Sequence, residues 1–173
     1  MTGREQILAS QLILRQKAEI STAKHLLQDF LDEAEKITQS EIGFFHFVEA
    51  DQINLSLQAW STNTRNKMCQ MLPEISHYPV DKAGVWVDCV YERQPVIHND
   101  YAALHHRKGL PKGHAPVIRE LVVPIFRDDK IVAIFGIGNK PSDYTQQDVE
   151  IVQAFGDMGW DIISRKQAEE KML

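Results

Sequence analysis

The chain has 173 residues and a formal net charge of −5 at pH 7, with 43% hydrophobic and 25% charged residues. This composition is typical of one globular domain with a helical extension, and the acidic charge argues against a general binder of nucleic acid or anionic membranes. No apolar run reaches the roughly 18 residues of a membrane span, and the N-terminus lacks the apolar core of a signal peptide. We therefore expect a cytoplasmic protein without a membrane span in this segment.

The N-terminal part of the chain is predicted to be helical. Residues 5–38 contain no glycine or proline. The stretch from Ile7 to Ile20 is the less regular part and is compatible with a separate helix that leads in from an upstream module. The following stretch repeats apolar residues at the three- and four-residue steps of one buried helical face. These residues are Leu26, Leu27, Phe30, Leu31, Ala34 and Ile37.

Two β-hairpins are expected farther along the chain. Residues 43–48 and 53–60 are rich in apolar and aromatic residues and are joined by a polar stretch. Residues 121–126 and 131–138 flank a tight turn at 127–130 and form the clearer hairpin. Both faces of its second strand are apolar, so the sheet should lie between two layers. Alternation places Val132, Ile134, Gly136 and Gly138 on one face and Ile131, Ala133, Phe135 and Ile137 on the other.

Shorter elements and an irregular segment are expected between these hairpins. Residues 62–72 and 82–93 are predicted to form short helices, with Asp81 as the N-cap of the second. Residues 96–98 are predicted to form a short strand. Residues 99–116 combine glycines and prolines with histidines and are irregular. A long loop inside a compact domain is usually functional, so we expect this segment to border a ligand site.

The last element is predicted to be a long helix from about Thr145 to the C-terminus, with two apolar seams. Gly156 and Gly159 should allow the first seam to pack against the glycine-bearing face of the last strand. We then expect the second seam to pair with a second copy as a parallel two-fold dimer. The first seam is Val149, Val152, Gly156, Gly159 and Ile163, and the second is Ile151, Phe155, Met158 and Ile162.

Several motifs in the second half of the chain resemble a GAF subfamily found in bacterial sensor histidine kinases and diguanylate cyclases. The resemblance covers roughly residues 20–165. It implies an α+β fold, with a GAF-like central antiparallel β-sheet of five or six strands and helices on both faces. The motifs are Asn99-Asp100-Tyr101, GLPKGHAP at 109–116, RELVVPIF at 119–126, IVAIFGIGNK at 131–140 and Asp143-Tyr144.

The resemblance also implies a domain organisation and a function. Residues 1–19 would be a helical lead-in, residues 20–165 the GAF sensor domain, and residues 166–173 the start of a helical linker to a downstream module. The domain would be a regulatory sensor of a small molecule and not an enzyme. Its ligand state would pass through the terminal helices to a histidine kinase or diguanylate cyclase in the same chain. The alternative is a ligand-free module for dimerisation and signal relay.

Other GAF chemistries fit the sequence less well. No cysteine lies between residues 90 and 173, where phytochrome-like GAF domains attach a bilin. Cys69 and Cys89 form no CxxC pair and do not resemble the cysteine set of GAF-type methionine sulfoxide reductases. GxSxG, HExxH and Walker motifs are absent, so no catalytic residue is assigned. The sequence names neither a ligand nor a cofactor.

One motif predicts an ion pair rather than a ligand contact. Asn139, Lys140, Tyr144 and Asp148 are similar to the Asn-Lys…Phe…Asp-Glu signature of cyclic-nucleotide-binding GAF domains. In that family the signature implies a lock between its lysine and its aspartate. Lys140 follows a strand, and Asp148 lies in the first turn of a helix, where a carboxylate is favoured. Tyr144 replaces the phenylalanine and Val149 the glutamate, so cyclic GMP is not inferred.

The candidate ligand contacts are expected in a pocket between the sheet and residues 84–116, and each has a structural alternative. The tryptophans fit either a ligand surface or the core, and Cys89 either a buried small hydrophobe or a redox sensor. Arg119 fits a contact with an anionic ligand, a solvated strand end or a partner of Asp100. The triplet at 99–101 either caps the loop or contacts ligand. The candidates are Trp60, Trp86, Cys89, Asn99, Asp100, Tyr101, Leu110, His114 and Arg119.

Four histidines lie close together in the sequence: His98, His105, His106 and His114. One interpretation is a metal or haem site, because imidazole is a common ligand of both. The other is a set of polar loop residues, with His114 bonded to the backbone. No cysteine or carboxylate stands at a fixed ligand spacing beside them, so no metal is predicted.

Overall fold

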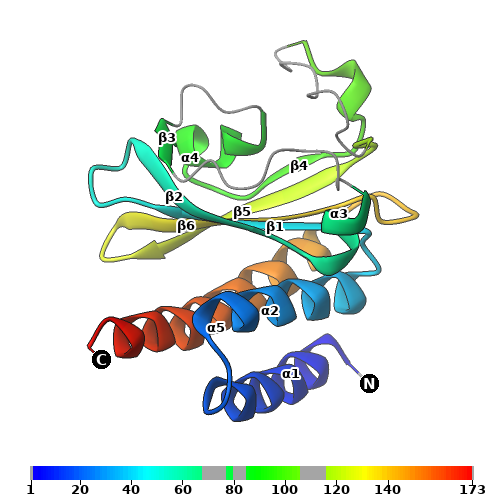
Figure 1. Cartoon of the computed structure of the whole chain (residues 1–173). Helices are drawn as coiled ribbons and strands as arrows, with labels where there is room; N and C mark the ends of the chain where they lie inside the picture. The colour runs from blue at the N-terminus through cyan, green and yellow to red at the C-terminus, as the bar shows by residue number, and fades with distance from the viewer. Residues whose placement is uncertain (1, 68–76, 80–84, 106–115, 173) are drawn as a thin grey trace.

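The computed structural model describes residues 2–67, 77–79, 85–105 and 116–172 of the chain (Figure 1). Its centre is a six-stranded sheet with the strand order β3-β2-β1-β6-β5-β4, and neighbouring strands pair antiparallel. Long helices cover one face and short helical segments lie on the other, so the predicted α+β architecture is confirmed. The strands are β1 (Ile42–Val48), β2 (Asn54–Trp60), β3 (His77–Pro79), β4 (Val96–His98), β5 (Glu120–Arg127) and β6 (Lys130–Gly138).

The second predicted hairpin is present. Near its turn, however, the residues of β6 face the opposite side of the sheet from the side that simple alternation predicts. Asp128 and Asp129 have φ values of 52° and 63°, as the central residues of a type I′ turn require. The β5–β6 register then slips by one residue between Ile125 and Phe126, which is a β-bulge. Ile131 therefore joins the buried cluster that contains Ile134, contrary to the predicted alternation. Val132 packs against the cluster on the opposite face.

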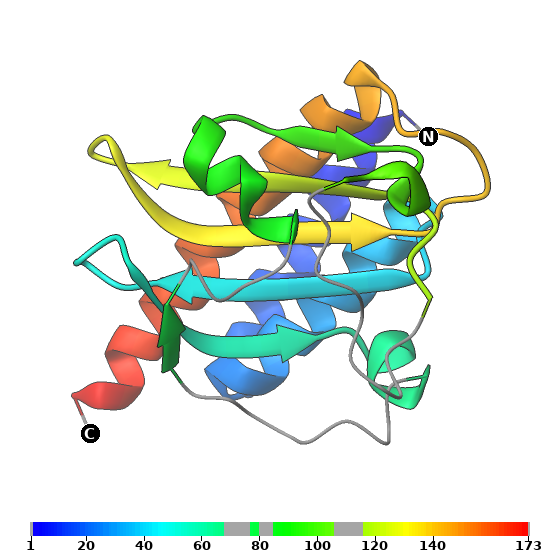
Figure 2. The same cartoon turned by 90° about the horizontal axis from the view of Figure 1, so that it is seen from above.

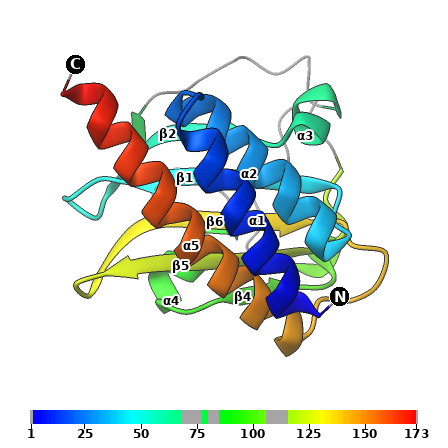
Figure 3. The ribbon, with the colours of Figure 1, turned by 90° about the horizontal axis from the view of Figure 1, so that it is seen from below.

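The N-terminal helical segment consists of two helices, α1 (Gly3–Ala18) and α2 (Ala23–Thr38). The chain turns between them, and the Thr22 hydroxyl accepts a hydrogen bond of 3.2 Å from the His25 amide, which caps α2. The helix α2 and the last helix, α5 (Gln146–Lys171), pack on the sheet. Helix α1 lies across both of them on the side away from the sheet (Figure 3). The N-terminal part is therefore helical as predicted, and the separate lead-in helix that the sequence allowed is present, with a break in the helical conformation between Ala18 and Ala23.

The core between the helices and the sheet is built from phenylalanines. The Phe30 ring of α2 stacks on the Phe155 ring of α5, with ring centroids 4.6 Å apart and an interplanar angle of 7°. It also meets Phe45 of β1 edge-on at 5.9 Å and Phe135 of β6 at 5.0 Å. All four side chains are fully buried. Burial of each such side chain contributes about 1.5–3 kcal/mol to folding, so this cluster fixes the helix layer on the sheet.

This packing overturns the predicted role of the second seam of α5. Phe155 and Ile162 are only 2% and 8% exposed, and they belong to the core of the single chain. Ile151 lies against Gly3 of α1. Helices α1 and α2 thus cover the seam that was expected to pair with a second copy. The first seam also divides between two partners, because Gly156 faces the sheet and Gly159 faces Phe30.

The predicted ion pair between Lys140 and Asp148 is confirmed. The Lys140 ammonium lies 3.0 and 2.9 Å from the two Asp148 carboxylate oxygens. Asp148 also accepts a hydrogen bond of 2.9 Å from the Thr145 amide and so completes a capping box at the start of α5. The Tyr144 hydroxyl lies 2.7 Å from the Ser40 hydroxyl and accepts from the Lys140 amide at 3.2 Å. These contacts fasten the end of β6 to the beginning of α5.

Replacing Asp148 with alanine is expected to lower the free energy of unfolding by about 2–4 kcal/mol, because it leaves a half-buried ammonium unpaired and removes the cap. Urea denaturation should show a lower midpoint with an unchanged slope. Glu169→Ala provides a matched control, since Glu169 forms an exposed ion pair with Arg165 in the same helix. That change should cost less than about 0.5 kcal/mol. Equal losses in the two variants would contradict this role of Asp148.

None of the described helices has the length and apolar character needed to cross a membrane.

Candidate functional site

The sheet face opposite α2 and α5 is covered by a short segment of chain. It contains the 3₁₀ helix η2 (Val85–Val87) and the helix α4 (Asp88–Glu92). Figure 2 shows α4 lying over β5 and β6, in agreement with its contacts. We call this side of the sheet the α4 face. Its buried cluster comprises Val48, Leu55, Val87, Cys89, Val122, Ile131 and Ile134.

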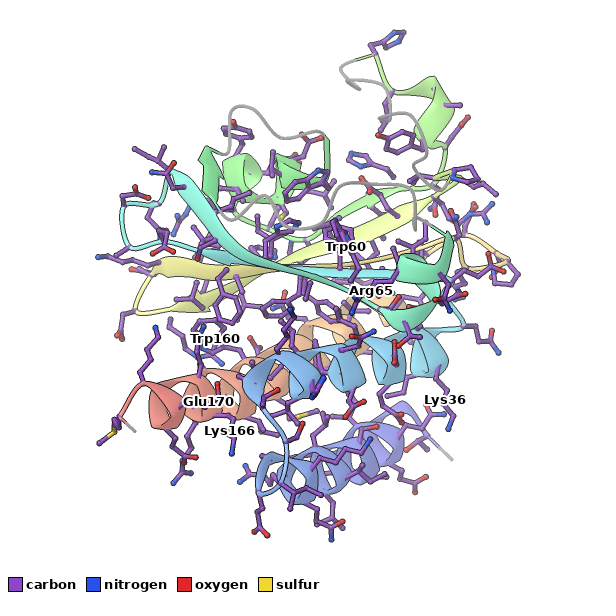
Figure 4. All side chains as sticks on the ribbon, in the orientation of Figure 1. Lys36, Trp60, Arg65, Trp160, Lys166 and Glu170 are labelled. Carbon is purple, nitrogen blue, oxygen red and sulfur yellow. The ribbon has the colours of Figure 1, made fainter. Side chains whose placement is uncertain are left out.

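A row of paired residues crosses the α4 face from β2 to β4. Paired residues in an antiparallel sheet share a face, so the register places Trp60, Phe44, Gly136, Val122 and Val96 side by side. A Cβ on Gly136 would come within 2.1 Å of the Phe44 ring, so only glycine lets the ring lie over the strand here. Figure 4 shows Trp60 on this side of the sheet and Trp160 on the helix side.

An aromatic cluster at the centre of this face includes a buried histidine. The rings of His46 and Trp86 stack, with centroids 4.3 Å apart and an interplanar angle of 17°. Phe44 meets both rings edge-on, at 5.9 and 5.7 Å. Burial lowers the pKa of His46 to about 3, so its imidazole is neutral near pH 7. The α4 face therefore carries a cluster of aromatic side chains with a neutral imidazole buried among them.

The sequence prediction included Trp60 and Trp86 but missed Phe44 and His46. The sequence did contain an indication of them. A histidine within the apolar stretch 43–48 is expected to be buried, and a buried imidazole needs a hydrogen-bond partner or a pocket. Phe44 and His46 are two residues apart in a strand and so face the same way. Combining these two points with the glycine at 136 would have identified the cluster.

His98 lies between two carboxylates at the edge of the same face. Its Nδ1 is 3.0 Å from a carboxylate oxygen of Glu120, and its Nε2 is 3.4 Å from a carboxylate oxygen of Asp88. The hydrogen bond to Glu120 and the nearby negative charges raise the pKa of His98, against the opposing effect of burial. The contact joins β4, β5 and α4, which are distant in sequence. His98 was considered only as a member of the histidine group.

Cys89 behaves as a buried small hydrophobe. Its side chain is 0% exposed, and its thiol contacts the Trp86 carbonyl oxygen at 3.8 Å. Burial raises the pKa of the thiol, and the charges of Glu120 and Asp88 raise it further. A redox sensor or nucleophile needs an accessible thiolate, so this environment favours the structural alternative for Cys89.

The remaining candidates lie near the ends of the strands. The Tyr144 amide donates to the Asn99 side-chain oxygen at 2.8 Å, and the Asn99 amide nitrogen donates to the Tyr144 carbonyl at 3.2 Å. These two hydrogen bonds join the segment after β4 to the segment before α5. They agree with the alternative in which Asn99 caps the loop and does not contact a ligand. Tyr101 is 6% exposed, and its amide donates to the Ile118 carbonyl, whereas Asp100 is exposed.

Arg119 is turned toward the β6–α5 connection. Its guanidinium donates to the Lys140 carbonyl, and its Nε lies 3.6 Å from an Asp143 oxygen. It therefore pairs with Asp143 rather than with Asp100. Leu110 and His114, like the predicted N-cap Asp81, lie outside the described residues. The structure brings Trp60, Trp86 and Cys89 onto the α4 face and places Asn99, Tyr101 and Arg119 in the loop contacts at its edge.

Within residues 2–67, 77–79, 85–105 and 116–172, no three His, Cys, Asp or Glu side chains are grouped in a way that could hold a metal ion. His106 and His114 fall outside these ranges.

Comparisons with known proteins identify the family. Residues 21–164 match the family model of the GAF domain. The chain is 36% identical over 142 residues to the methyl sulfide methyltransferase-associated sensor of Methanosarcina acetivorans, a match that covers 82% of this chain and 14% of that protein. The chain thus spans a small part of the length of this relative.

Solved structures support the same fold. The GAF domain of a phosphoenolpyruvate-protein phosphotransferase from Coxiella burnetii has a TM-score of 0.72 at 11% identity, with 96% of this chain and 98% of that chain covered. Free methionine-R-sulfoxide reductase from Neisseria meningitidis has a TM-score of 0.60 at 13% identity, with 94% and 89% covered. At these identities the likeness concerns the fold alone. Since the family model spans most of the sequence, the chain belongs to the GAF domain family.

Proposed function

We propose that this domain binds a small molecule on the α4 face and acts as a regulatory sensor without catalytic activity. The observation that carries the proposal is the cluster of Trp86, His46 and Phe44, because stacked aromatic rings beside a neutral polar group suit a flat organic ligand. Membership of the GAF family and 36% identity to a protein named as a sensor support the same role. Trp60 would extend this surface toward β2.

The proposed signal leaves through the terminal helices. Ligand binding would select one position of α4 on the sheet, which is a population shift between states that already exist. β6 crosses the α4 face, and the Lys140–Asp148 ion pair fastens its end to α5. A small movement of β6 would therefore reach α5 and a linker at residues 166–173. The output would be a histidine kinase or diguanylate cyclase downstream of a domain at residues 20–165.

We also propose that two copies associate through α1. Leu8 and Leu12 are 57% and 60% exposed on its outer side, and Ile13 is 46% exposed. An antiparallel pairing places Leu8 opposite Leu12 and the exposed Glu5 opposite the exposed Arg15. A parallel pairing would instead place each charge opposite its own copy. Charge complementarity therefore favours a second, antiparallel copy of this chain as the partner of this surface.

Ligand binding is tested by a thermal-shift screen with nucleotides, amino acids, aromatic acids and haem, guided by mass spectrometry of whatever co-purifies. We expect at least one compound to raise the unfolding temperature, because a ligand that binds only the folded state stabilises it. Trp86→Ala should abolish this shift. Trp160→Ala is the matched control, since Trp160 packs against Phe47 on the other side of the sheet. It should preserve the shift.

The same screen separates the main alternative from this proposal. A ligand-free relay module would give no stabilising compound and no co-purifying molecule. A shift that survives Trp86→Ala but is lost in Trp160→Ala would place binding away from the α4 face.

A further inference from the structure

We propose that the end of the β5–β6 hairpin couples α4 to α5 across the sheet. Phe126 and Arg127 are adjacent residues of β5, and they contact α4 on one face of the sheet and α5 on the other. Arg93 at the end of α4 is the residue through which α4 acts on the hairpin. The use of this connection to relay a ligand signal rests on the proposed function. The coupling of α4 to α5 does not, because it can be measured without any ligand.

On the α4 face, Arg93 joins the end of α4 to the hairpin. Arg93 is the C-cap residue of α4, and its guanidinium donates a hydrogen bond of 2.6 Å to the Asp129 carbonyl oxygen in the turn. The same guanidinium lies over the Phe126 ring, with its central carbon 5.0 Å from the ring centroid, which is a cation–π contact. Phe126 also packs against the buried cluster of this face, which includes Cys89 of α4. A displacement of α4 therefore acts directly on the end of β5.

On the helix face, Arg127 joins the same strand end to α5. Its guanidinium donates to the Asp157 carbonyl oxygen at 3.0 Å and to a carboxylate oxygen of Asp161 at 2.9 Å. The Asp157 carboxylate lies 3.4 Å from the guanidinium as well. One turn earlier in α5, the Gln153 side chain donates to the Pro124 carbonyl oxygen at 3.2 Å. Side chains from three successive turns of α5 thus contact the last residues of β5.

The end of β5 can transmit a movement because it is paired on one side. Within the described residues β4 pairs with residues 120–122 of β5, whereas β6 pairs along the whole strand as far as Arg127. A strand end that is bonded to one neighbour moves more easily than one bonded to two. Figure 1 shows this hairpin end between α4 above the sheet and α5 below it. The Lys140–Asp148 ion pair holds the first turn of α5, so a displacement of Arg127 would tilt the helix about that turn.

Cys89 provides a probe of how firmly α4 is held. It lies in α4 and is 0% exposed, so a thiol reagent reaches it only when α4 moves away from the sheet. A Cys69→Ser background leaves Cys89 as the only cysteine of the chain. The measurement is its rate of reaction with iodoacetamide at one fixed pH. The substitutions are Arg93→Gln on the α4 side, Arg127→Gln on the α5 side, and both together.

We expect Arg127→Gln to raise the rate about fivefold, although Arg127 contacts α5 on the opposite face, because coupling between two sites acts in both directions. In the Arg93→Gln background the same change should have no further effect, since the connection to α4 is already lost. Lys17→Gln is the matched control. It breaks an ion pair with Asp29 within the helix layer, with side chains 46% and 38% exposed against 34% and 47% for Arg127 and Asp157. It should leave the rate unchanged.

Two results would overturn the coupling. One is an unchanged rate in Arg127→Gln, and the other is an equal increase with and without Arg93, which indicates general destabilisation. If Arg127→Gln does not fold, Asp161→Asn decides the question, because it weakens the same contact from a side chain that is 67% exposed on α5. A failed ligand screen would leave these rates unaffected. An unchanged rate in Arg127→Gln would remove the coupling and leave ligand binding on the α4 face standing.

Discussion

Replacing Phe155 and Ile162 together with glutamate is expected to abolish cooperative folding of the domain. Both side chains are buried in the helix layer, at 2% and 8% exposure, and Phe155 stacks on Phe30. Loss of a buried phenylalanine alone costs about 3–5 kcal/mol, and a buried carboxylate adds a further penalty. The sum reaches the whole stability of a typical domain, about 5–15 kcal/mol. Circular dichroism should show no cooperative thermal transition.

A matched pair of substitutions on α1 provides the control. Leu8→Glu with Leu12→Glu introduces the same charges at residues that are 57% and 60% exposed. The free energy of unfolding should change by no more than about 1 kcal/mol, because both sites face solvent in the single chain. If two copies associate through α1 as proposed, light scattering should show a dimer for the wild type and a folded monomer for this variant. If the double substitution Phe155→Glu with Ile162→Glu unfolded at the same urea midpoint as the wild type, the packing of α5 in the core would be contradicted.

The sequence predicted those parts of the fold that depend on local periodicity and turn chemistry. The β5–β6 hairpin follows from two apolar strands around Asp128 and Asp129, and the start of α5 follows from Thr145 and Asp148. The return of α1 onto α5 was not predictable in this way, because contact between residues so far apart leaves no periodic signal. The second seam of α5 was correctly identified as a packing surface, but its partner was wrong. The bulge between Ile125 and Phe126 was also missed, because alternation alone does not reveal that Val132 of β6 is an extra residue without a paired partner on β5.

The candidate site was predicted in part. Trp60 and Trp86 were chosen as large aromatic residues near an irregular segment, and the register of the sheet brings Trp60 into the row that includes Phe44. Asn99 and Arg119 were chosen as polar residues beside the same segment, but both bond to the β6–α5 connection. Most hydrogen bonds of polar side chains go to backbone groups or water, and sequence spacing does not separate such a side chain from one that contacts a ligand. His98 required the pairing of β4 with β5 to bring it to Glu120.

The two glycines of α5 are expected to respond differently to the same substitution. A Cβ on Gly159 would lie 2.2 Å from the Phe30 ring, whereas one on Gly156 would lie 3.0 Å from Phe135 and 3.3 Å from Ile125. Phe30 is 0% exposed and is held by three other phenylalanines, so it has no space into which to move. Gly159→Ala should therefore destabilise the domain although alanine is the better helix former.

Helix propensity cancels when the two variants are compared. Alanine gains about 1 kcal/mol over glycine at either position of the helix interior. We expect Gly159→Ala to lower the free energy of unfolding by about 2 kcal/mol overall, since overpacking a rigid core costs about 1–3 kcal/mol or more. Gly156→Ala should remain within about 1 kcal/mol of the wild type. Combining Gly159→Ala with Phe30→Leu should cost less than the sum of the two single changes, because the smaller side chain relieves the overlap. Equal losses for the two glycines, or strict additivity with Phe30→Leu, would mean that Gly159 is not required for the approach of α2 to α5.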